Sequence, residues 1–273
     1  MGRIDELWRY DGRRVVVTGC ASGIGEHLAR QLIELGAEVV GLDRQRPAVA
    51  LKEFHEIDLA DPASIDHAVE AVGDRVDALF NVAGVSSGIG DPLLVVKINF
   101  LGTRYLTEAL TGAINSGGSV ACVSSLAASG YLEHKDVTAG LVQTQSFEQG
   151  VEWCSRHPDA LADGGYRLSK EAIILYCMCG AVPLGARGIR INCTAPGVTD
   201  TPILDQLRSA YGQEYLDTIP KPLGRVSNPA EQAAALLFLN SQAASYITGQ
   251  VLWVDGGNVG AKIADSLQKG ERR

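Results

Sequence analysis

Tyr166 and Lys170 lie four residues apart in a helical run that begins YRLSKEA. Residues with this spacing share one face of a helix. A tyrosine loses its proton near pH 10, so action as a base near pH 7 requires a pKa shift of about 3 units, roughly 4 kcal/mol. A neighbouring ammonium group in a desolvated cleft shifts the pKa in that direction. The pair is a candidate for proton transfer, although the same spacing is also common on solvated helices.

Two polar positions elsewhere in the chain support this hypothesis. Ser125 is the second of two serines that follow an apolar run at 119–123, and Asn99 interrupts the apolar run VKINF. A buried asparagine that bonds backbone groups is the alternative explanation for Asn99, and the two roles are compatible. The candidate catalytic residues are Asn99, Ser125, Tyr166 and Lys170.

The turn TGCASGIG at 18–25 joins a short β-branched run to a segment with helical periodicity. Glycines in such a turn let the backbone approach a phosphate, and the amides at the start of the helix bind a pyrophosphate. The turn alone is weak evidence. However, Asp43 ends the next apolar run about 20 residues later, where an acid binds the ribose hydroxyls of NAD and repels the extra phosphate of NADP. Arg44 could instead contact that phosphate, but Asp43 and the lack of a basic residue in the turn favour NAD.

Short apolar runs alternate with helical segments along the chain and predict the elements that hold these residues. Strand-like runs lie at 14–18, 38–42, 53–57, 76–82, 119–123, 189–195 and 250–254. Asp61-Pro62 and Asn228-Pro229 are typical helix starts, with a capping residue before a proline. This alternation predicts a single α/β domain over residues 1–273, with a doubly wound parallel sheet of about seven strands covered by helices on both faces.

Two segments depart from this alternation. Residues 130–165 separate a strand from the next helix, where a connection usually takes about 2–6 residues. We expect this insertion to form a partly helical cap whose apolar residues wall a substrate pocket, or else to pack on the outside and affect oligomer contacts. The second segment, residues 258–273, is expected to be a loose charged tail.

Length and composition exclude several classes of protein. The chain has 273 residues, 46% hydrophobic residues and a net charge of -8, so a basic nucleic-acid-binding surface is not expected. The nearly uncharged stretch at 172–186 is too short to span a membrane, and the start of the chain has no apolar run typical of a signal peptide. The six scattered cysteines and five histidines show no metal-ligand spacing, which predicts reduced thiols, no metal and a cytoplasmic location.

Taken in order, these motifs resemble the short-chain dehydrogenase/reductase family. The resemblance rests on TGCASGIG, NVAG at 81–84, Asn99, the serine pair, Tyr166-x-x-x-Lys170 and Pro196-Gly197, and it covers nearly the whole chain. Within the family the chain most resembles the bacterial coniferyl alcohol dehydrogenases and the 3α-hydroxysteroid dehydrogenase/carbonyl reductases, which also carry a long insertion before the active-site tyrosine. The chain departs from the common NNAG motif at Val82.

The resemblance implies a Rossmann fold, a homodimer or homotetramer, and hydride transfer between NAD and an alcohol or ketone, with Tyr166 as the acid/base. It implies that Lys170 lowers the tyrosine pKa and binds the nicotinamide ribose, that Ser125 binds the substrate oxygen, and that Asn99 supports Lys170 through water. It also implies cofactor contacts from Gly19, Ser22, Gly23, Ile24, Gly25, Asp43, Asp58, Leu59, Asn81, Ala83, Gly84, Tyr166, Lys170, Pro196, Gly197, Val198, Thr199 and Thr201.

We expect the substrate to be a bulky hydrophobic alcohol or ketone, such as an aryl-allylic, terpenoid or steroid compound. A catalytically idle dinucleotide sensor is an alternative, but it would be expected to lack one of the four candidate catalytic residues. A sugar-nucleotide epimerase is a second alternative, but those chains are longer and have a differently spaced glycine turn.

Overall fold

Seven parallel strands form one sheet at the centre of the molecule, in the order β3-β2-β1-β4-β5-β6-β7. The computed structural model describes residues 4–270. The strands are β1 (Arg14–Thr18), β2 (Glu38–Asp43), β3 (Glu53–Glu56), β4 (Val76–Asn81), β5 (Ile114–Val123), β6 (Arg190–Pro196) and β7 (Val251–Val254). Each predicted strand is confirmed. The buried central strands leave short apolar runs in the sequence, whereas the edge strands β3 and β7 contain no fully buried residue.

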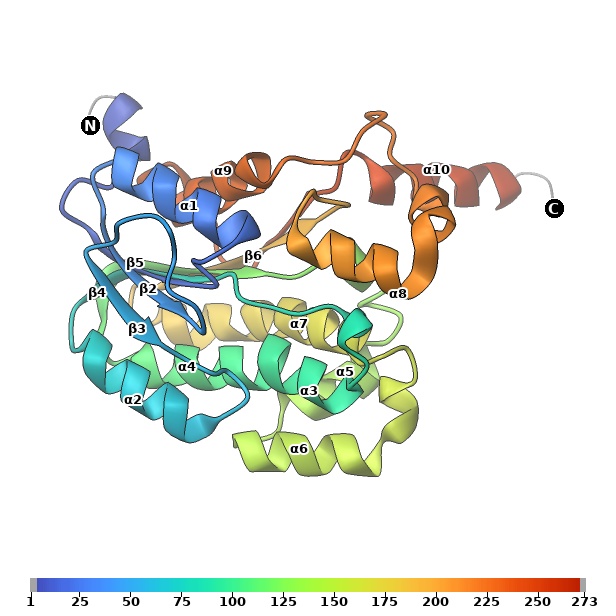
Figure 1. The fold of residues 1–273 in the computed structure, drawn as a ribbon, viewed down its shortest axis with the longest axis horizontal. Helices are drawn as coiled ribbons and strands as arrows, with labels where there is room; N and C mark the ends of the chain where they lie inside the picture. Colours follow the sequence, from blue (N-terminus) through green and yellow to red (C-terminus); the bar gives the residue numbers. More distant parts are fainter. Residues whose placement is uncertain (1–3, 271–273) are drawn as a thin grey trace.

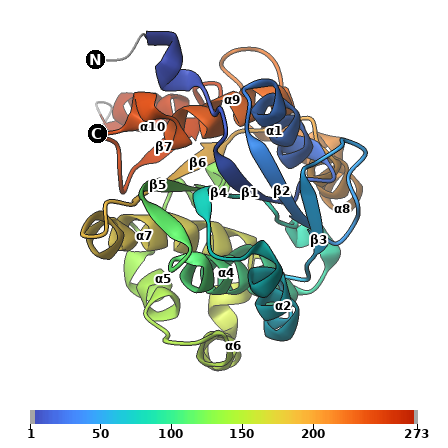
Figure 2. The same ribbon diagram turned by 90° about the vertical axis from the view of Figure 1, so that its left-hand side faces the viewer.

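Helices cover both faces of this sheet (Figures 1 and 2). The helices are α1 (Gly23–Glu34), α2 (Pro62–Val72), α3 (Pro92–Val96), α4 (Thr103–Leu110), α5 (Lys135–Val142), α6 (Phe147–Arg156), α7 (Tyr166–Gly185), α8 (Pro202–Thr218), α9 (Pro229–Asn240) and α10 (Asn258–Gly270). Helices α1 and α9 pack on one face, whereas α2, α4 and α7 pack on the other. The predicted doubly wound, single-domain Rossmann fold is confirmed.

The predicted helix starts are confirmed in detail. The Asp61 side chain accepts a hydrogen bond from the Ala63 amide at the start of α2. Asn228 caps α9 in a reciprocal pair with Glu231, whose carboxylate accepts from the Asn228 amide at 2.8 Å. Proline lacks a backbone N–H, but its absence costs no hydrogen bond here, because the amides in the first turn of a helix have no partner within the helix.

The switch in strand order positions the functional site. Strand β1 lies between β2 and β4, and the chain crosses the sheet between β3 and β4. In such open sheets a crevice forms at the carboxyl ends of the strands where the winding reverses, and ligands bind there. The glycine turn follows β1 and the NVAG segment follows β4, so both lie at this crevice.

The insertion at 130–165 folds into α5, α6 and a short 3-10 turn at Pro158–Leu161. In Figures 1 and 2 it forms a further layer outside α4 and α7. Leu141 is fully buried and Phe147 is 5% exposed, and both extend the main core, whereas Leu132 is 64% exposed. The expectation that this apolar surface walls the substrate pocket is therefore wrong. The apolar residues pack against the helices beneath them, and only the end of the insertion, residues 162–164, reaches the cleft.

The segment after β7 is also not the loose tail that its charges suggested. Residues 258–270 form α10, which projects from one end of the molecule (Figure 1). Ile263 and Leu267 lie four residues apart and leave an exposed apolar stripe on this helix. This spacing was the signal for a helix, and the charged residues around it, Lys262, Asp265 and Lys269, obscured it.

Helix α7 is long and apolar enough to cross a membrane, by length and composition alone. It lies instead against the sheet, where Ile173, Ile174 and Cys177 are almost fully buried in the core. Its buried residues lie mainly at 168–174, whereas Cys179 and Val182 near its end are exposed.

We predict that the insertion stabilises the protein through its buried residues. Replacing the fully buried Leu141 with alanine should lower the free energy of unfolding by about 2–5 kcal/mol, because it removes apolar contacts and leaves a cavity. The matched control Leu132→Ala, at an exposed position of the same insertion, should change it by less than about 0.5 kcal/mol. Equal effects in urea denaturation would show that the insertion is not packed as described.

Candidate active site

A cleft of about 830 Å³ opens at the carboxyl ends of the central strands. This volume lies near the top of the range of about 300–1,000 Å³ that is typical of ligand sites. Eighteen predicted site residues line it, namely Gly19, Ser22, Gly23, Ile24, Gly25, Asp43, Asp58, Leu59, Ala83, Gly84, Ser125, Tyr166, Lys170, Pro196, Gly197, Val198, Thr199 and Thr201. Asn81 and Asn99 are buried beside the cleft and do not line it. The fold therefore brings together residues from across most of the sequence.

The glycine turn is shaped by close backbone contacts. Gly19 has a φ of +71°, and a Cβ there would lie 2.8 Å from the Ala83 backbone. A Cβ on Gly25 would lie 2.0 Å from the Gly19 carbonyl oxygen, so helix α1 can begin against the turn only with glycine at that position. The amides at the start of α1 border a cradle that matches a pyrophosphate in charge and size.

Asp43 ends strand β2 at the edge of this cradle. One carboxylate oxygen accepts from the Ala21 amide at 2.9 Å, and the other accepts from the Gln45 amide at 3.0 Å. The carboxylate is thereby fixed beside the glycine turn, where ribose hydroxyls can reach it. Arg44 also lines the cleft, so the two residues that bear on the choice between NAD and NADP are both present there.

The NVAG segment lies against the glycine turn and is tied to it by Thr18. The Thr18 hydroxyl accepts from the amides of Val82 and Ala83 at 2.9 and 3.0 Å. Asn81 points away from the cleft and donates to the Thr107 hydroxyl at 2.8 Å. The Asn81 side-chain amide is buried between β4 and α4, so the predicted cofactor contact at this position would come from the backbone.

Asn99 sits in a distorted turn, Lys97–Gly102, where the helical hydrogen bonds widen to a π-type pattern. Its amide bonds the Val85 backbone on both sides, accepting from the Val85 amide at 2.8 Å and donating to the carbonyl oxygen at 3.0 Å. It also donates to the Ser169 hydroxyl on α7 at 3.2 Å. Asn99 thus connects the loop after β4 to the catalytic helix, in line with the alternative role of a buried residue that bonds backbone.

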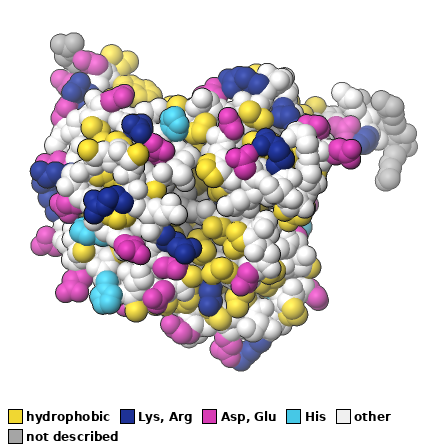
Figure 3. Space-filling view, in the orientation of Figure 1, with side chains coloured by type: hydrophobic (Ala, Val, Ile, Leu, Met, Phe, Trp, Pro, Cys, Tyr) yellow, Lys and Arg dark blue, Asp and Glu magenta, His cyan; other side chains and the backbone are white. Residues whose placement is uncertain are grey.

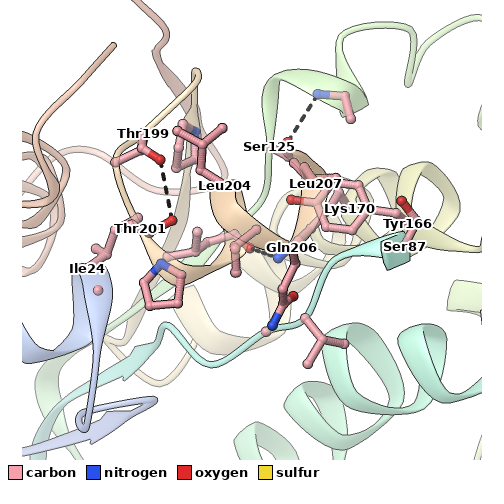
Figure 4. Close-up of a pocket in the computed structure, with 18 of the residues that line it drawn as sticks. Ile24, Ser87, Ser125, Tyr166, Lys170, Thr199, Thr201, Leu204, Gln206 and Leu207 are labelled. Carbon is pink, nitrogen blue, oxygen red and sulfur yellow. Dashed lines mark hydrogen bonds between the residues drawn. The ribbon is translucent and has the colours of Figure 1, made fainter. Parts of the chain in front are cut away.

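Ser125, Tyr166 and Lys170 converge on one side of the cleft (Figure 4). Ser125 follows strand β5, while Tyr166 and Lys170 lie on the first turns of α7. The Lys170 ammonium donates to the Val123 carbonyl oxygen at 2.9 Å and lies 5.7 Å from the centre of the Tyr166 ring. The Ser124 hydroxyl donates to the Lys170 carbonyl oxygen at 2.7 Å, which fixes α7 to the end of β5.

Burial dominates the protonation of this group. It raises the pKa of Tyr166, and the hydrogen bond with Ser125 opposes this shift only in part. Burial also lowers the pKa of Lys170, to about 8. The expected lowering of the tyrosine pKa by Lys170 stays a prediction, because burial is the largest influence on the Tyr166 pKa in the protein by itself. Tyr166 is a proton donor at neutral pH in this state.

The remaining predicted residues lie toward the opposite end of the cleft. Thr201 donates to the Thr199 carbonyl oxygen at 3.4 Å, and Figure 4 shows both on the same side as Ile24. The Asp58 side chain accepts from the Ala60 amide at 2.9 Å and lies with Leu59 after strand β3. The loop after Pro196 and the loop after β3 thus both line the cleft.

Several cleft residues were missed by sequence reasoning. Helix α8 contributes Gln206 and Tyr211, the loop after β4 contributes Ser87, and the end of the insertion contributes Asp163 beside Arg167. They belong to no common motif, and only the tertiary arrangement places them together. The cysteines were predicted better, since Cys20, Cys122, Cys154, Cys177 and Cys193 are buried and free. Cys179 is also free but is exposed on α7.

Fold and site together define a dinucleotide-binding α/β protein with a tyrosine and a lysine at the cleft. Two family models match the sequence: "NAD dependent epimerase/dehydratase family" over residues 15–144 and "Enoyl-(Acyl carrier protein) reductase" over residues 159–258.

Curated relatives match over almost the whole chain. The chain is 36% identical to the coniferyl-alcohol dehydrogenase of Pseudomonas sp. strain HR199, covering 90% of this chain and 96% of that protein. It is 30% identical to the 3-alpha-hydroxysteroid dehydrogenase/carbonyl reductase of Comamonas testosteroni, covering 89% and 95%. Among solved structures, the 3-alpha-hydroxysteroid dehydrogenase from Pseudomonas sp. B-0831 complexed with NADH is similar with a TM-score of 0.78 and 33% identity, covering 89% and 95%. The chain belongs to the short-chain dehydrogenase/reductase family and is a nicotinamide-dependent oxidoreductase.

The burial of Lys170 predicts a pH-dependent contribution to stability. Its pKa falls from 10.5 to about 8 on folding, so between these pH values the unfolded chain binds a proton that the folded protein has released. The free energy of unfolding of the wild type, relative to Lys170→Met, should therefore rise by about 3 kcal/mol as the pH increases from 8 to 10.5. Denaturation at several pH values measures this difference.

Lys52→Met is the matched control, because Lys52 is exposed. Its difference from the wild type should not follow the same pH dependence. A flat difference for Lys170→Met over this range would contradict the lowered pKa of Lys170.

Proposed function

We propose that this protein is an NAD-dependent dehydrogenase/reductase that transfers hydride between the nicotinamide and a bulky hydrophobic alcohol or ketone. The observation that carries the proposal is the convergence of Ser125, Tyr166 and Lys170 in a cleft that continues into the glycine cradle. A binding protein without catalysis would need the cradle but would not need a half-buried tyrosine and a buried lysine in the same cleft.

The residues of the cradle fit a nicotinamide dinucleotide. Gly19 and Gly25 leave no room for a side chain, and the start of α1 offers amides to a pyrophosphate. The fixed Asp43 carboxylate supports NAD over NADP, because it would bond two ribose hydroxyls and repel a 2′-phosphate. When bound, the cofactor supplies the carbon that gives or accepts the hydride.

Proton transfer is the part of the reaction that we assign to Tyr166. In ketone reduction, the phenol would give its proton to the substrate oxygen as that oxygen gains negative charge, and in alcohol oxidation it would take the proton back. Ser125 would hold the same oxygen by a hydrogen bond. The Lys170 ammonium would stabilise the phenolate that forms after proton donation, while Asn99 holds the adjacent loop and α7 in register.

The substrate class is supported by the apolar residues that line the cleft. The apolar residues there are Leu126, Leu204, Leu207, Leu216 and Ile219, and Figure 3 shows hydrophobic side chains gathered on this face below α8. Each Å² of apolar substrate covered contributes about 25 cal/mol. Relatives named for coniferyl alcohol and for a hydroxysteroid are consistent with an aryl-allylic, terpenoid or steroid alcohol.

We propose that the protein acts in the cytoplasm as a homodimer or homotetramer, without nucleic acid or membrane. Its free cysteines suit a reducing compartment. The net charge of -8 is unfavourable for nucleic acid, and the exposed Val182 and Tyr246 offer apolar surface to another copy. A catalytically idle sensor is the second candidate, but all four predicted catalytic residues are present, which favours an enzyme.

Removal of the Tyr166 hydroxyl tests the proposed acid/base. Tyr166→Phe should bind NADH with unchanged affinity while its turnover falls by two or more orders of magnitude, about the loss expected for a general acid/base. In the wild type, oxidation should become faster and reduction slower as the pH rises, since the raised tyrosine pKa keeps the phenol protonated at neutral pH. Near-normal turnover in the variant would assign proton transfer to another group.

Cofactor preference tests the role of Asp43. We predict a preference for NAD over NADP of about a hundredfold or more in kcat/KM, since repulsion and lost hydrogen bonds with a 2′-phosphate amount to a few kcal/mol. Asp43→Ser should reduce this ratio markedly, whereas Arg44→Gln should leave NAD use intact. Comparable efficiency of the wild type with both cofactors would contradict the assignment.

A further inference from the structure

Gln206 is a polar residue among the apolar side chains that α8 presents to the cleft. It lies between Leu204 and Leu207, both of which line the same cavity. Figure 4 shows Gln206, Leu207 and Ser87 on the same side of the pocket as Ser125, Tyr166 and Lys170, whereas Ile24, Thr199 and Thr201 lie on the other side. The amide therefore lies at the substrate end of the cleft rather than at the pyrophosphate cradle.

The orientation of this amide is set by Ser86, which is fully buried. The Ser86 oxygen accepts from the Gly88 amide at 3.2 Å, and its hydroxyl proton is donated to the Gln206 carbonyl oxygen Oε1 at 3.0 Å. With Oε1 held in this way, the Nε2 group is the free end of the amide. Within residues 4–270, Nε2 of Gln206 has no hydrogen-bond acceptor, so it is a donor available to a ligand.

The loop that holds Gln206 is fixed relative to Tyr166. Asn99 bonds both backbone groups of Val85, the residue before Ser86. Ser87 accepts from the Tyr211 hydroxyl on α8 at 2.8 Å. A Cβ on Gly164, two residues before Tyr166, would lie 2.7 Å from the Ser87 Cβ, so the loop also touches the start of the catalytic helix. The Gln206 donor therefore has a defined place with respect to the reacting oxygen.

The charged side chains near Gln206 favour a neutral oxygen of the ligand over a carboxylate. Arg167 is the cationic side chain that lines this end of the cleft beside Lys170. It is already shared between Asp163 at 2.7 Å and the fully buried Glu171 at 3.1 Å. A substrate carboxylate here would be repelled by Asp163 and Glu171, and Arg167 is already paired with both of them. A neutral substrate oxygen needs only a hydrogen-bond donor.

We propose that Gln206 is a specificity-determining residue whose Nε2 donates a hydrogen bond to a neutral oxygen substituent on the substrate, away from the reacting carbinol. The substrate class is thereby narrowed to bulky alcohols or ketones that carry a hydroxyl, methoxy or carbonyl oxygen on an otherwise apolar body. This inference rests on the proposed function, because it assumes that the alcohol binds beside Tyr166.

The test compares cinnamyl alcohol with coniferyl alcohol, which adds a hydroxyl and a methoxy group to the same apolar body. Gln206→Met removes the donor at similar size and should lower kcat/KM for coniferyl alcohol by about tenfold, the upper range for one neutral hydrogen bond. The value for cinnamyl alcohol should change by less than about twofold. Ser86→Ala should act in the same direction and more weakly, because it releases the amide from its fixed orientation.

Gln213→Met is the control, since Gln213 is exposed like Gln206 but follows the break in α8 at Gly212 and does not line the cleft. It should leave both alcohols unaffected. An equal loss for the two alcohols in Gln206→Met would show that the residue only holds α8 in place, and no loss would show that it does not contact substrate; either result overturns the proposal.

Failure of the proposed function is distinguished by the wild type. If it oxidises neither alcohol with NAD, the dehydrogenase assignment for these alcohols is wrong. The dissociation constants of the two alcohols from the NADH complex then test Gln206 separately. A selective loss of affinity for coniferyl alcohol in Gln206→Met supports the donor, and an unchanged affinity ratio overturns it.

Discussion

The buried Lys170 ammonium is the group around which the rest of the site is arranged. It needs a hydrogen-bond acceptor in a place that excludes water, and the Val123 carbonyl oxygen at the end of β5 supplies one at 2.9 Å. A Cβ on Gly84 would come within 3.3 Å of this ammonium and 3.1 Å of the Asn99 side-chain oxygen. Strand β5, helix α7 and the NVAG loop must therefore approach one another closely, and glycine at that position allows it.

Hydrogen bonds of Thr18 and Asn99 connect the cofactor end of the cleft to its substrate end. Thr18 ties the NVAG loop to the glycine turn, so the cofactor cradle has a fixed position relative to β4. Asn99 ties the next residues, through Val85, to Ser169 on the catalytic helix. The loop after β4 thus connects the cradle to the substrate end. Substitutions of Asn99 would disturb both cofactor and substrate binding, even though its side chain does not line the cleft.

Features that depend on local sequence could be predicted, and features that depend on tertiary packing could not. The strands, the glycine turn and the capped starts of α2 and α9 leave short patterns of residue type and spacing. The position of the insertion outside α4 and α7 leaves no such pattern in the sequence, because an apolar side chain such as Leu141 can line a pocket or pack in a core equally well. The raised pKa of Tyr166 likewise follows from burial, which the spacing to Lys170 does not reveal.

The Ser86–Gln206 contact shows the same limit at the substrate end. The two residues are 120 positions apart, and neither belongs to a family motif. The cofactor end was easier to predict because the glycine turn, residues 19–25, provides most of it. The substrate end combines α8, the loop after β4 and the end of the insertion, and such combinations vary independently of the catalytic residues.

Hydride transfer itself can be measured most directly in a single turnover. Excess protein is mixed with NAD and coniferyl alcohol, either unlabelled or deuterated at the carbinol carbon, and NADH absorbance is followed. If the cleft holds both reactants beside Tyr166, NADH should form in proportion to the limiting cofactor, and the deuterated alcohol should react more slowly. Tight binding of NADH with no NADH formed from any aryl-allylic, terpenoid or steroid alcohol would contradict the account.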